Sequence, residues 1–135
     1  MVTQVGRTAK DRSIRMRKIT RLASKAFKQG KPFSRDNTLV KTYTVNDDSW
    51  NQLFLHGNCI AEQNIQSGEL LITLAGWPTP TTRERLNGLL QTMGYSIRLY
   101  QHKYEQYLWN YETNKKTDMP SDWLSVNEIA QELAV

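Results

Sequence analysis

The sequence has little of what builds metal centres, disulfides or membrane spans. It contains one cysteine, Cys59, and two histidines, His56 and His102. A single cysteine excludes an intramolecular disulfide, and one Cys with two His is too few for a Cys/His zinc site, so we expect no metal and no cofactor. The sequence has no apolar run of the roughly 18 residues that a membrane span needs, and no apolar signal-peptide stretch. These absences predict a cytoplasmic protein.

Catalytic motifs are also missing. The sequence has no Walker-type glycine loop, no pair of acids in a common motif and no metal-ligand cluster. His56 and Cys59 are close in the chain, but a Gly57-Asn58 turn separates them and no third group is positioned to orient His56. We expect His56 to end a strand and Cys59 to be a small core residue. The sequence therefore predicts a protein that is not an enzyme.

Charge is present in quantity, and it is unevenly placed. The 135 residues suit one domain with a buried core and carry a net charge of +5. Residues 1–35 hold eleven Lys and Arg against one acid, a net +10, and the remainder holds seven basic and twelve acidic residues, a net −5. This asymmetry indicates an arm that meets an anionic partner. We divide the chain into a basic N-terminal arm and helix (1–35), an α+β core domain (36–111), and a linker with a C-terminal helix (112–135).

The arm contains a basic amphipathic helix. It is expected to begin at Asp11 or Ser13 and to end at Gly30, which tolerates the left-handed conformation, with Pro32 beyond it. Apolar residues recur with a helical period and cations gather on the opposite side. The apolar stripe is Ile19, Leu22, Ala23, Ala26 and Phe27, and the basic side is Arg17, Lys18, Arg21, Lys25 and Lys28.

After Phe33 the pattern changes to short strands. Thr81 and Glu84 suggest a capping box for a helix that ends at Gly94, and Ser125 with Glu128 suggests another for a C-terminal helix. Residues 112–120 are expected to be a polar linker. We predict an α+β fold: an antiparallel sheet of about six strands, made of a meander of four, a helix and a hairpin. The expected strands are Thr38–Val45, Trp50–His56, Cys59–Ile65, Leu70–Ala75, Tyr95–Tyr100 and Tyr104–Tyr111.

Three stretches of the core stand out. They are Asn37-Thr38-x-Val40, then Leu53-Phe54-Leu55-His56-Gly57-Asn58-x-Ile60-Ala61, and then Gly76-Trp77-x-Thr79-x-Thr81-Thr82-x-x-Arg85-Leu86-Asn87. This succession resembles small proteins encoded by tailed bacteriophages, in which a helix containing Ala and Phe also precedes it. The likeness covers about residues 20 to 110. It implies expression in an infected bacterial cell and supplies no mechanism.

The basic helix is the strongest candidate site. Like charges at i, i+4, as at Arg17, Arg21 and Lys25, destabilise a helix by a few tenths of a kcal/mol per pair, so a neutralising anion would explain this side. DNA or RNA phosphates would serve. The alternatives are a solvated face, or docking on an acidic surface of its own domain, a neighbouring subunit or another protein. The candidate nucleic-acid-binding residues are Arg12, Arg15, Arg17, Lys18, Arg21, Lys25, Lys28 and Lys31.

Two further sites are weaker candidates. Free N–H groups and the positive dipole end at the start of the central helix would hold a phosphate or carboxylate, although Glu84 competes for the same donors and favours plain capping. One face of the last strand would stack bases if exposed, whereas aromatics on strands more often belong to the core. The candidate anion site is Thr79, Thr81, Thr82, Arg83 and Arg85, and the candidate stacking residues are Tyr107, Trp109 and Tyr111.

Taken together, these features predict a non-enzymatic, phage-type accessory protein that binds the nucleic acid backbone through its basic helix. Little sequence specificity is expected, because phosphate contacts do not read bases. The alternative is a module that binds a host bacterial protein and modulates or inhibits a host enzyme. A homo-oligomer built through the apolar stripe is compatible with either function.

Overall fold

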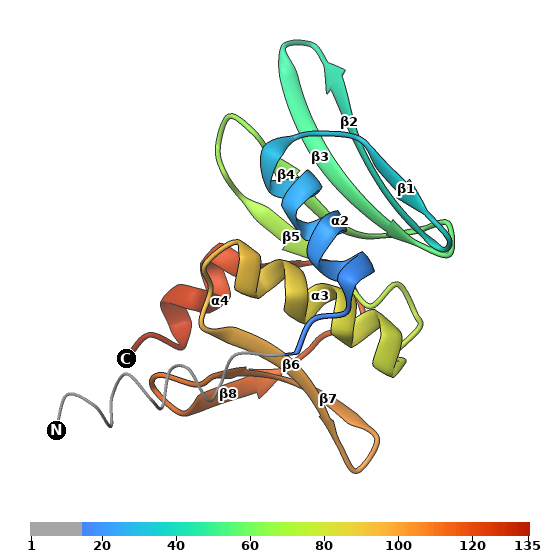
Figure 1. Cartoon of the computed structure of the whole chain (residues 1–135). Helices are drawn as coiled ribbons and strands as arrows, with labels where there is room; N and C mark the ends of the chain where they lie inside the picture. The colour runs from blue at the N-terminus through green and yellow to red at the C-terminus, as the bar shows by residue number, and fades with distance from the viewer. Residues whose placement is uncertain (1–14) are drawn as a thin grey trace, which may run out of the picture.

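The computed structural model describes residues 15–135 and has the α+β fold expected from the sequence. Two antiparallel sheets lie on either side of a helical layer (Figure 1). The larger sheet has the strand order β1-β2-β3-β4-β5-β9, and the smaller sheet has the order β6-β7-β8. Within the described residues, no helix has the length and apolar character needed to cross a membrane.

The larger sheet is built on the predicted meander of four consecutive strands, which is confirmed. Its β3–β4 turn uses His56 and Gly57, with φ of 50° and 80°, so both central residues are left-handed as a type I′ turn requires. The turn expected at Gly57-Asn58 therefore lies one residue earlier in the chain. The strands are β1 Phe33–Arg35, β2 Thr38–Val45, β3 Asp48–Leu55, β4 Asn58–Asn64, β5 Leu70–Ile72 and β9 Leu124–Ser125.

Helix α2 (Lys18–Gln29) packs its apolar stripe against the core. Its predicted end is confirmed: Gly30 has φ 68°, and the N–H groups of Gly30 and Lys31 bond the carbonyls of Phe27 and Ala26. Asn51 of β3 adds a hydrogen bond from Nδ2 to the Phe27 carbonyl, at 2.9 Å. The expected beginning is wrong within the described part of the chain, because residues 15–17 are not helical. Residues 11–14 lie outside the described range.

Helix α3 (Pro80–Thr92) lies between the two sheets (Figure 1). Leu86, Leu89 and Leu90 are fully buried, and so is Arg85, so much of its circumference is covered. The hairpin after it packs on the far side of α3 and does not join the larger sheet, which corrects the expected single sheet. Its strands are β6 Ile97–His102 and β7 Glu105–Asn110, and β8 Lys115–Asp118 completes the smaller sheet.

The C-terminal part confirms one expectation and corrects another. The expected polar linker contains β8, whose Lys-Lys-Thr-Asp sequence has no apolar alternation and lies at the sheet edge, where exposed lysines are common. Helix α4 (Val126–Glu132) begins as predicted: the Ser125 hydroxyl accepts the Glu128 N–H at 3.4 Å. Ile129 and Leu133 then pack into the core.

A glycine controls how closely α2 and α3 approach. A Cβ atom on Gly88 would overlap the methyl group of Thr20 and would lie 3.1 Å from the Met16 side chain. Only the absence of a side chain at this position lets the two helices pack as they do.

We expect Gly88→Ala to lower the free energy of unfolding by about 1–3 kcal/mol through overpacking, although helix propensity alone would raise it by about 1 kcal/mol. Thr20→Ser removes the colliding methyl and keeps the hydroxyl, so the double variant should recover much of the loss. Urea unfolding followed by circular dichroism measures all three variants. A single Gly88→Ala variant as stable as the original protein would contradict the close packing.

Candidate functional site

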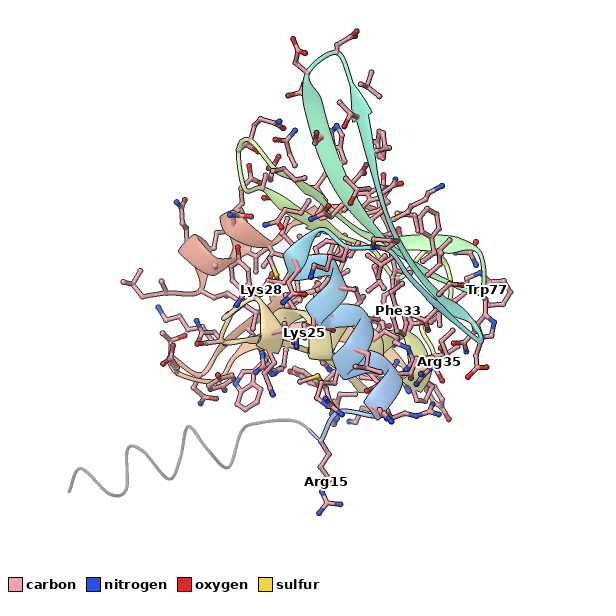
Figure 2. The ribbon with its side chains drawn as sticks, turned by 45° about the horizontal axis from the view of Figure 1, so that its top comes forward. Arg15, Lys25, Lys28, Phe33, Arg35 and Trp77 are labelled. Atoms are coloured by element: carbon pink, nitrogen blue, oxygen red, sulfur yellow. The ribbon has the colours of Figure 1, made fainter. Side chains whose placement is uncertain are left out.

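The cationic side of α2 lies on the surface of the molecule. Its five cations are exposed while the apolar stripe behind them is buried, so the helix packs on the core with its charge outward (Figure 2). Arg15 before the helix and Lys31 after it are also exposed, and Arg12 lies outside the described residues. We refer to Arg17, Lys18, Arg21, Lys25 and Lys28 as the basic face.

No side chain of the basic face forms an ion pair with a carboxylate within the described residues. The ion pair that this part of the chain contains is Arg85–Glu84, which does not involve the basic face. Arg17 and Lys18 stand at the positive end of the helix dipole, where cations cost about 0.3–1 kcal/mol each, and the first turn has no acid. The cations of α2 therefore do not dock on an acidic surface of the same domain. Ile19, Ala23, Ala26 and Phe27 of the stripe are buried in the same chain, and Leu22 is half-buried.

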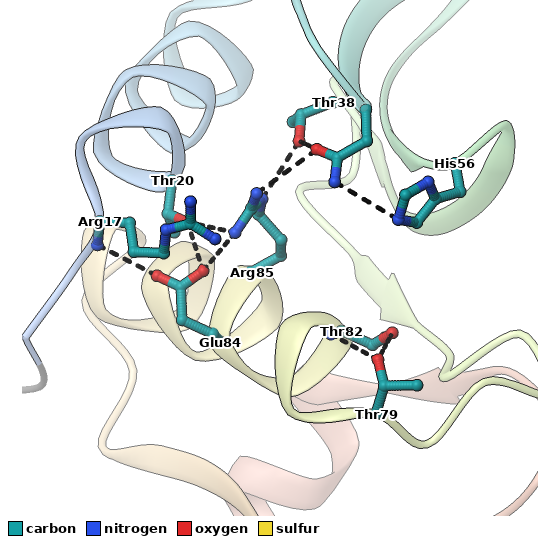
Figure 3. A network of polar contacts seen from close by, with 9 residues as sticks. Arg17, Thr20, Thr38, His56, Thr79, Thr82, Glu84 and Arg85 are labelled. Carbon is teal, nitrogen blue, oxygen red and sulfur yellow. Dashed lines mark hydrogen bonds and ion pairs between the residues drawn. The ribbon is translucent and has the colours of Figure 1, made fainter.

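A buried guanidinium ties the start of α2 to α3 and β2 (Figure 3). Arg85 is 1% exposed, and its Nε donates to Thr38 Oγ1 at 3.1 Å. Its Nη1 donates to Thr20 Oγ1 at 3.0 Å and to the Glu84 carboxylate. Glu84 also accepts from the Thr20 hydroxyl and, at 3.2 Å, from the backbone N–H of Arg17. Three elements therefore meet on one ion pair.

The capping box predicted at Thr81 and Glu84 is wrong. Thr79 is the N-cap, and its Oγ1 accepts the N–H of Thr82 at 3.2 Å. Pro80 occupies the first helical position, which its fixed φ and missing N–H suit. The helix thus begins two residues earlier than expected, and Glu84 is free to bond the N–H of Arg17 at the start of α2.

The candidate anion site at the start of α3 is not assembled. Residues two apart on a helix do not face each other, and Arg83 and Arg85 accordingly point to different partners. Arg83 donates to the Pro78 carbonyl and to two glutamine side chains, whereas Arg85 is buried in the network above. Thr82 is also buried, with its hydroxyl 3.0 Å from that of Thr79. Neither arginine is available to an anion beside Thr81.

The candidate stacking residues lie on the face of the smaller sheet that points away from α3. Tyr107, Trp109 and Tyr111 are half-buried, whereas Leu108 on the opposite face is 1% exposed. Tyr107 stacks on Tyr100 with ring centroids 5.3 Å apart and planes at 24°. The core position that we favoured from the sequence is therefore wrong for these side chains.

A hollow of about 420 Å³ between the β3–β4 turn and the start of α3 was not predicted. Trp77 is 60% exposed beside it. Two of the three phage-like stretches, residues 53–61 and 76–87, contribute most of its lining. The lining consists of Leu55, His56, Asn58, Ile60, Leu74, Trp77, Thr79, Thr81 and Thr82.

His56 and Cys59 have separate partners. His56 Nε2 lies 3.3 Å from Asn37 Nδ2, and the Cys59 thiol donates to the Ala61 carbonyl at 3.4 Å. Burial raises the pKa of Cys59 to about 11, with Glu62 adding to the effect. No group of three His, Cys, Asp or Glu side chains in residues 15–135 is placed to hold a metal ion.

The structure is that of a small α+β protein with a row of exposed cations along helix α2. Residues 16–130 match the sequence profile of a family described as Kyanoviridae Gp96 protein, and the chain belongs to this phage family. The resemblance to proteins of tailed bacteriophages is thereby confirmed. Neither the curated proteins nor the solved structures compared with the chain include a match.

We expect Arg85→Met to lower the free energy of unfolding by about 3 kcal/mol, because it leaves the Glu84 carboxylate without its buried partner. Adding Glu84→Gln should restore part of that loss. Arg83→Met on the same helix is the control, and it should cost less than about 1 kcal/mol, since Arg83 is more exposed and bonds neutral groups. Thermal and urea unfolding measure each variant. Equal losses for the two arginines would contradict the central role of the network.

We expect alkylation of Cys59 by iodoacetamide to be about 100-fold slower at pH 8 than in the urea-unfolded chain, because the thiolate is the reactive form and its pKa is about two units higher in the folded protein. The folded-state rate should rise about tenfold per pH unit until about pH 11. Mass spectrometry of quenched samples gives both rates. A plateau near pH 9 would show an ordinary thiol.

Proposed function

We propose that this chain is a non-enzymatic phage accessory protein that binds the nucleic acid backbone through the basic face of α2. The observation that supports the proposal is the set of five exposed cations, four on α2 and Arg17 at its N-cap, none of them paired with a carboxylate in the described part of the chain. Phosphates would supply the missing counter-charge and relieve the repulsion along the helix.

The packing of α2 adds to this argument. Both ends of the helix are held by other elements, through the Arg17 N–H to Glu84 and the Phe27 carbonyl to Asn51. The cations are therefore carried on a docked helix, with neighbours three and four residues apart lying roughly 5–6 Å from each other. Backbone phosphates are contacted by such side chains without base readout, so little sequence preference is expected.

Salt dependence tests the proposal. If all five cations neutralise phosphates, the slope of log K against log salt should be about −4.5 on duplex DNA and about −3.5 on single strands. Replacing Arg21, Lys25 and Lys28 together by Gln should make either slope shallower by about 2–3 and weaken binding at every sequence tried. Fluorescence anisotropy with labelled DNA and RNA measures this.

The control replaces Arg35, Lys41 and Lys103 by Gln, which removes the same net charge from exposed positions outside the basic face. This control should keep most of the salt slope. The absence of salt-dependent binding to any nucleic acid would refute the proposal. Suppose that the original protein then captured a host protein from nuclease-treated bacterial lysate, and that the variant with Arg21, Lys25 and Lys28 replaced by Gln did not. The basic face would then be a protein-docking surface instead.

A further inference from the structure

We propose that the outer face of the smaller sheet stacks unpaired nucleotide bases, so that the nucleic acid held by the basic face is single-stranded. This inference rests on the proposed function and specifies its ligand. We refer to the surface formed by Tyr100, Tyr107, Trp109 and Lys116 as the aromatic face.

The composition of the aromatic face is unusual for its position. An antiparallel sheet with one covered face ordinarily turns polar side chains to the solvent. Here the covered face holds Leu99 and Leu108, 4% and 1% exposed, while the opposite face of β6 and β7 holds half-buried tyrosines and a tryptophan. Flat rings that are accessible on an open sheet provide the surface on which successive bases stack, whatever their sequence.

A hollow on this face has room for a base. It measures about 480 Å³ and is lined by Tyr100, Trp109, Asn114 and Lys116. The indole Nε1 donates to Asn114 Oδ1 at 3.0 Å, which fixes the orientation of the Trp109 ring. Two rings, an amide and an ammonium group around one hollow offer stacking, hydrogen bonding and phosphate attraction together.

Positive charge surrounds the tryptophan. The strand register places Trp109 directly between Arg98 and Lys116. Arg98 is 6% exposed, its Nε has no hydrogen-bond partner, and no carboxylate in residues 15–135 pairs with it. Its Nη1 donates to the carbonyls of Tyr95 and Ile97, at 2.8 and 2.7 Å, so neutral groups rather than a carboxylate hold this charge beside Trp109. The acids Glu105 and Asp118 lie toward the Tyr107 end and Glu112 follows Tyr111 at the other end, so the phosphate-attracting groups beside Trp109 are Arg98 and Lys116.

The aromatic face borders, at Tyr100, a hollow that Arg15 also lines. This second hollow, of about 320 Å³, is lined by Tyr100 together with Arg15, Arg83, Glu84 and three further residues. Arg15 lies two positions before Arg17, the N-cap of α2. A strand whose bases stack near Tyr100 therefore reaches Arg15 on its way to the basic face.

The test compares a single-stranded 15-mer with the duplex of the same sequence by fluorescence anisotropy. The original protein should bind the single strand more tightly. Trp109→Leu should weaken single-strand binding about tenfold, since stacking contributes about 1–3 kcal/mol per base, and should leave duplex binding unchanged. Trp50→Leu is the matched control, because Trp50 stacks on Tyr43 across strands of the other sheet, with centroids 6.4 Å apart.

A second measurement needs no variant and so does not depend on how the substitutions fold. Photocrosslinking of the original protein to an oligonucleotide containing 5-iodouracil should label the segment 104–115, which includes Trp109. Equal affinity for single strand and duplex, with no effect of Trp109→Leu and no adduct in this segment, would overturn the inference and leave the basic face intact. Absence of binding to either form would instead refute the proposed function.

Discussion

The ion pair between Arg85 and Glu84 is the interaction that holds α2, and with it the basic face, in place. Helix α2 has like charges one turn apart, cations at its positive dipole end and no side-chain cap, and an isolated helix of this length is marginal in water even with good residues. Its formation therefore relies on tertiary contacts. Arg85 orders Glu84 and Thr20, Glu84 accepts the first amide of the helix, and Gly88 gives α2 the space to approach.

The two surfaces proposed to meet nucleic acid have different origins in the fold. The basic face exists because α2 buries only one stripe and leaves the rest outside. The aromatic face exists because α3 covers a single side of the smaller sheet (Figure 1). Membership of the phage family indicates where the protein is made and supplies no chemistry, so the functional argument rests on these two surfaces.

Local signals explain which parts of the fold could be predicted. The helical period and Gly30 define most of α2, polar turns separate the four strands of the meander, and Ser125 marks the start of α4. Strands β1, β8 and β9 were missed because they are short and polar or lie at sheet edges, where neighbours rather than composition decide pairing. Pro80 opens α3, whereas the expected capping box began the helix after Thr81.

Long-range contacts explain what could not be predicted about the site. A cation in a helix sequence is expected outside, and the distant partners Thr20 and Thr38 add to the adjacent Glu84 the contacts that make the burial of Arg85 acceptable. The same limit applies to the aromatic residues of β7: period two shows that they share a face, but which face α3 covers is decided by the packing of the whole chain.

The end contacts of α2 come from side chains of other elements, and this affects how the helix forms. Because the carboxylate that receives the first amide of α2 belongs to α3, and the amide that bonds its last turn belongs to β3, neither end is satisfied until those elements are in place. Both ends of α2 therefore gain their stability from contacts with α3 and β3. Before those contacts form, the same cations are a flexible polycation that attracts any polyanion; only the finished fold spaces them along one rigid line.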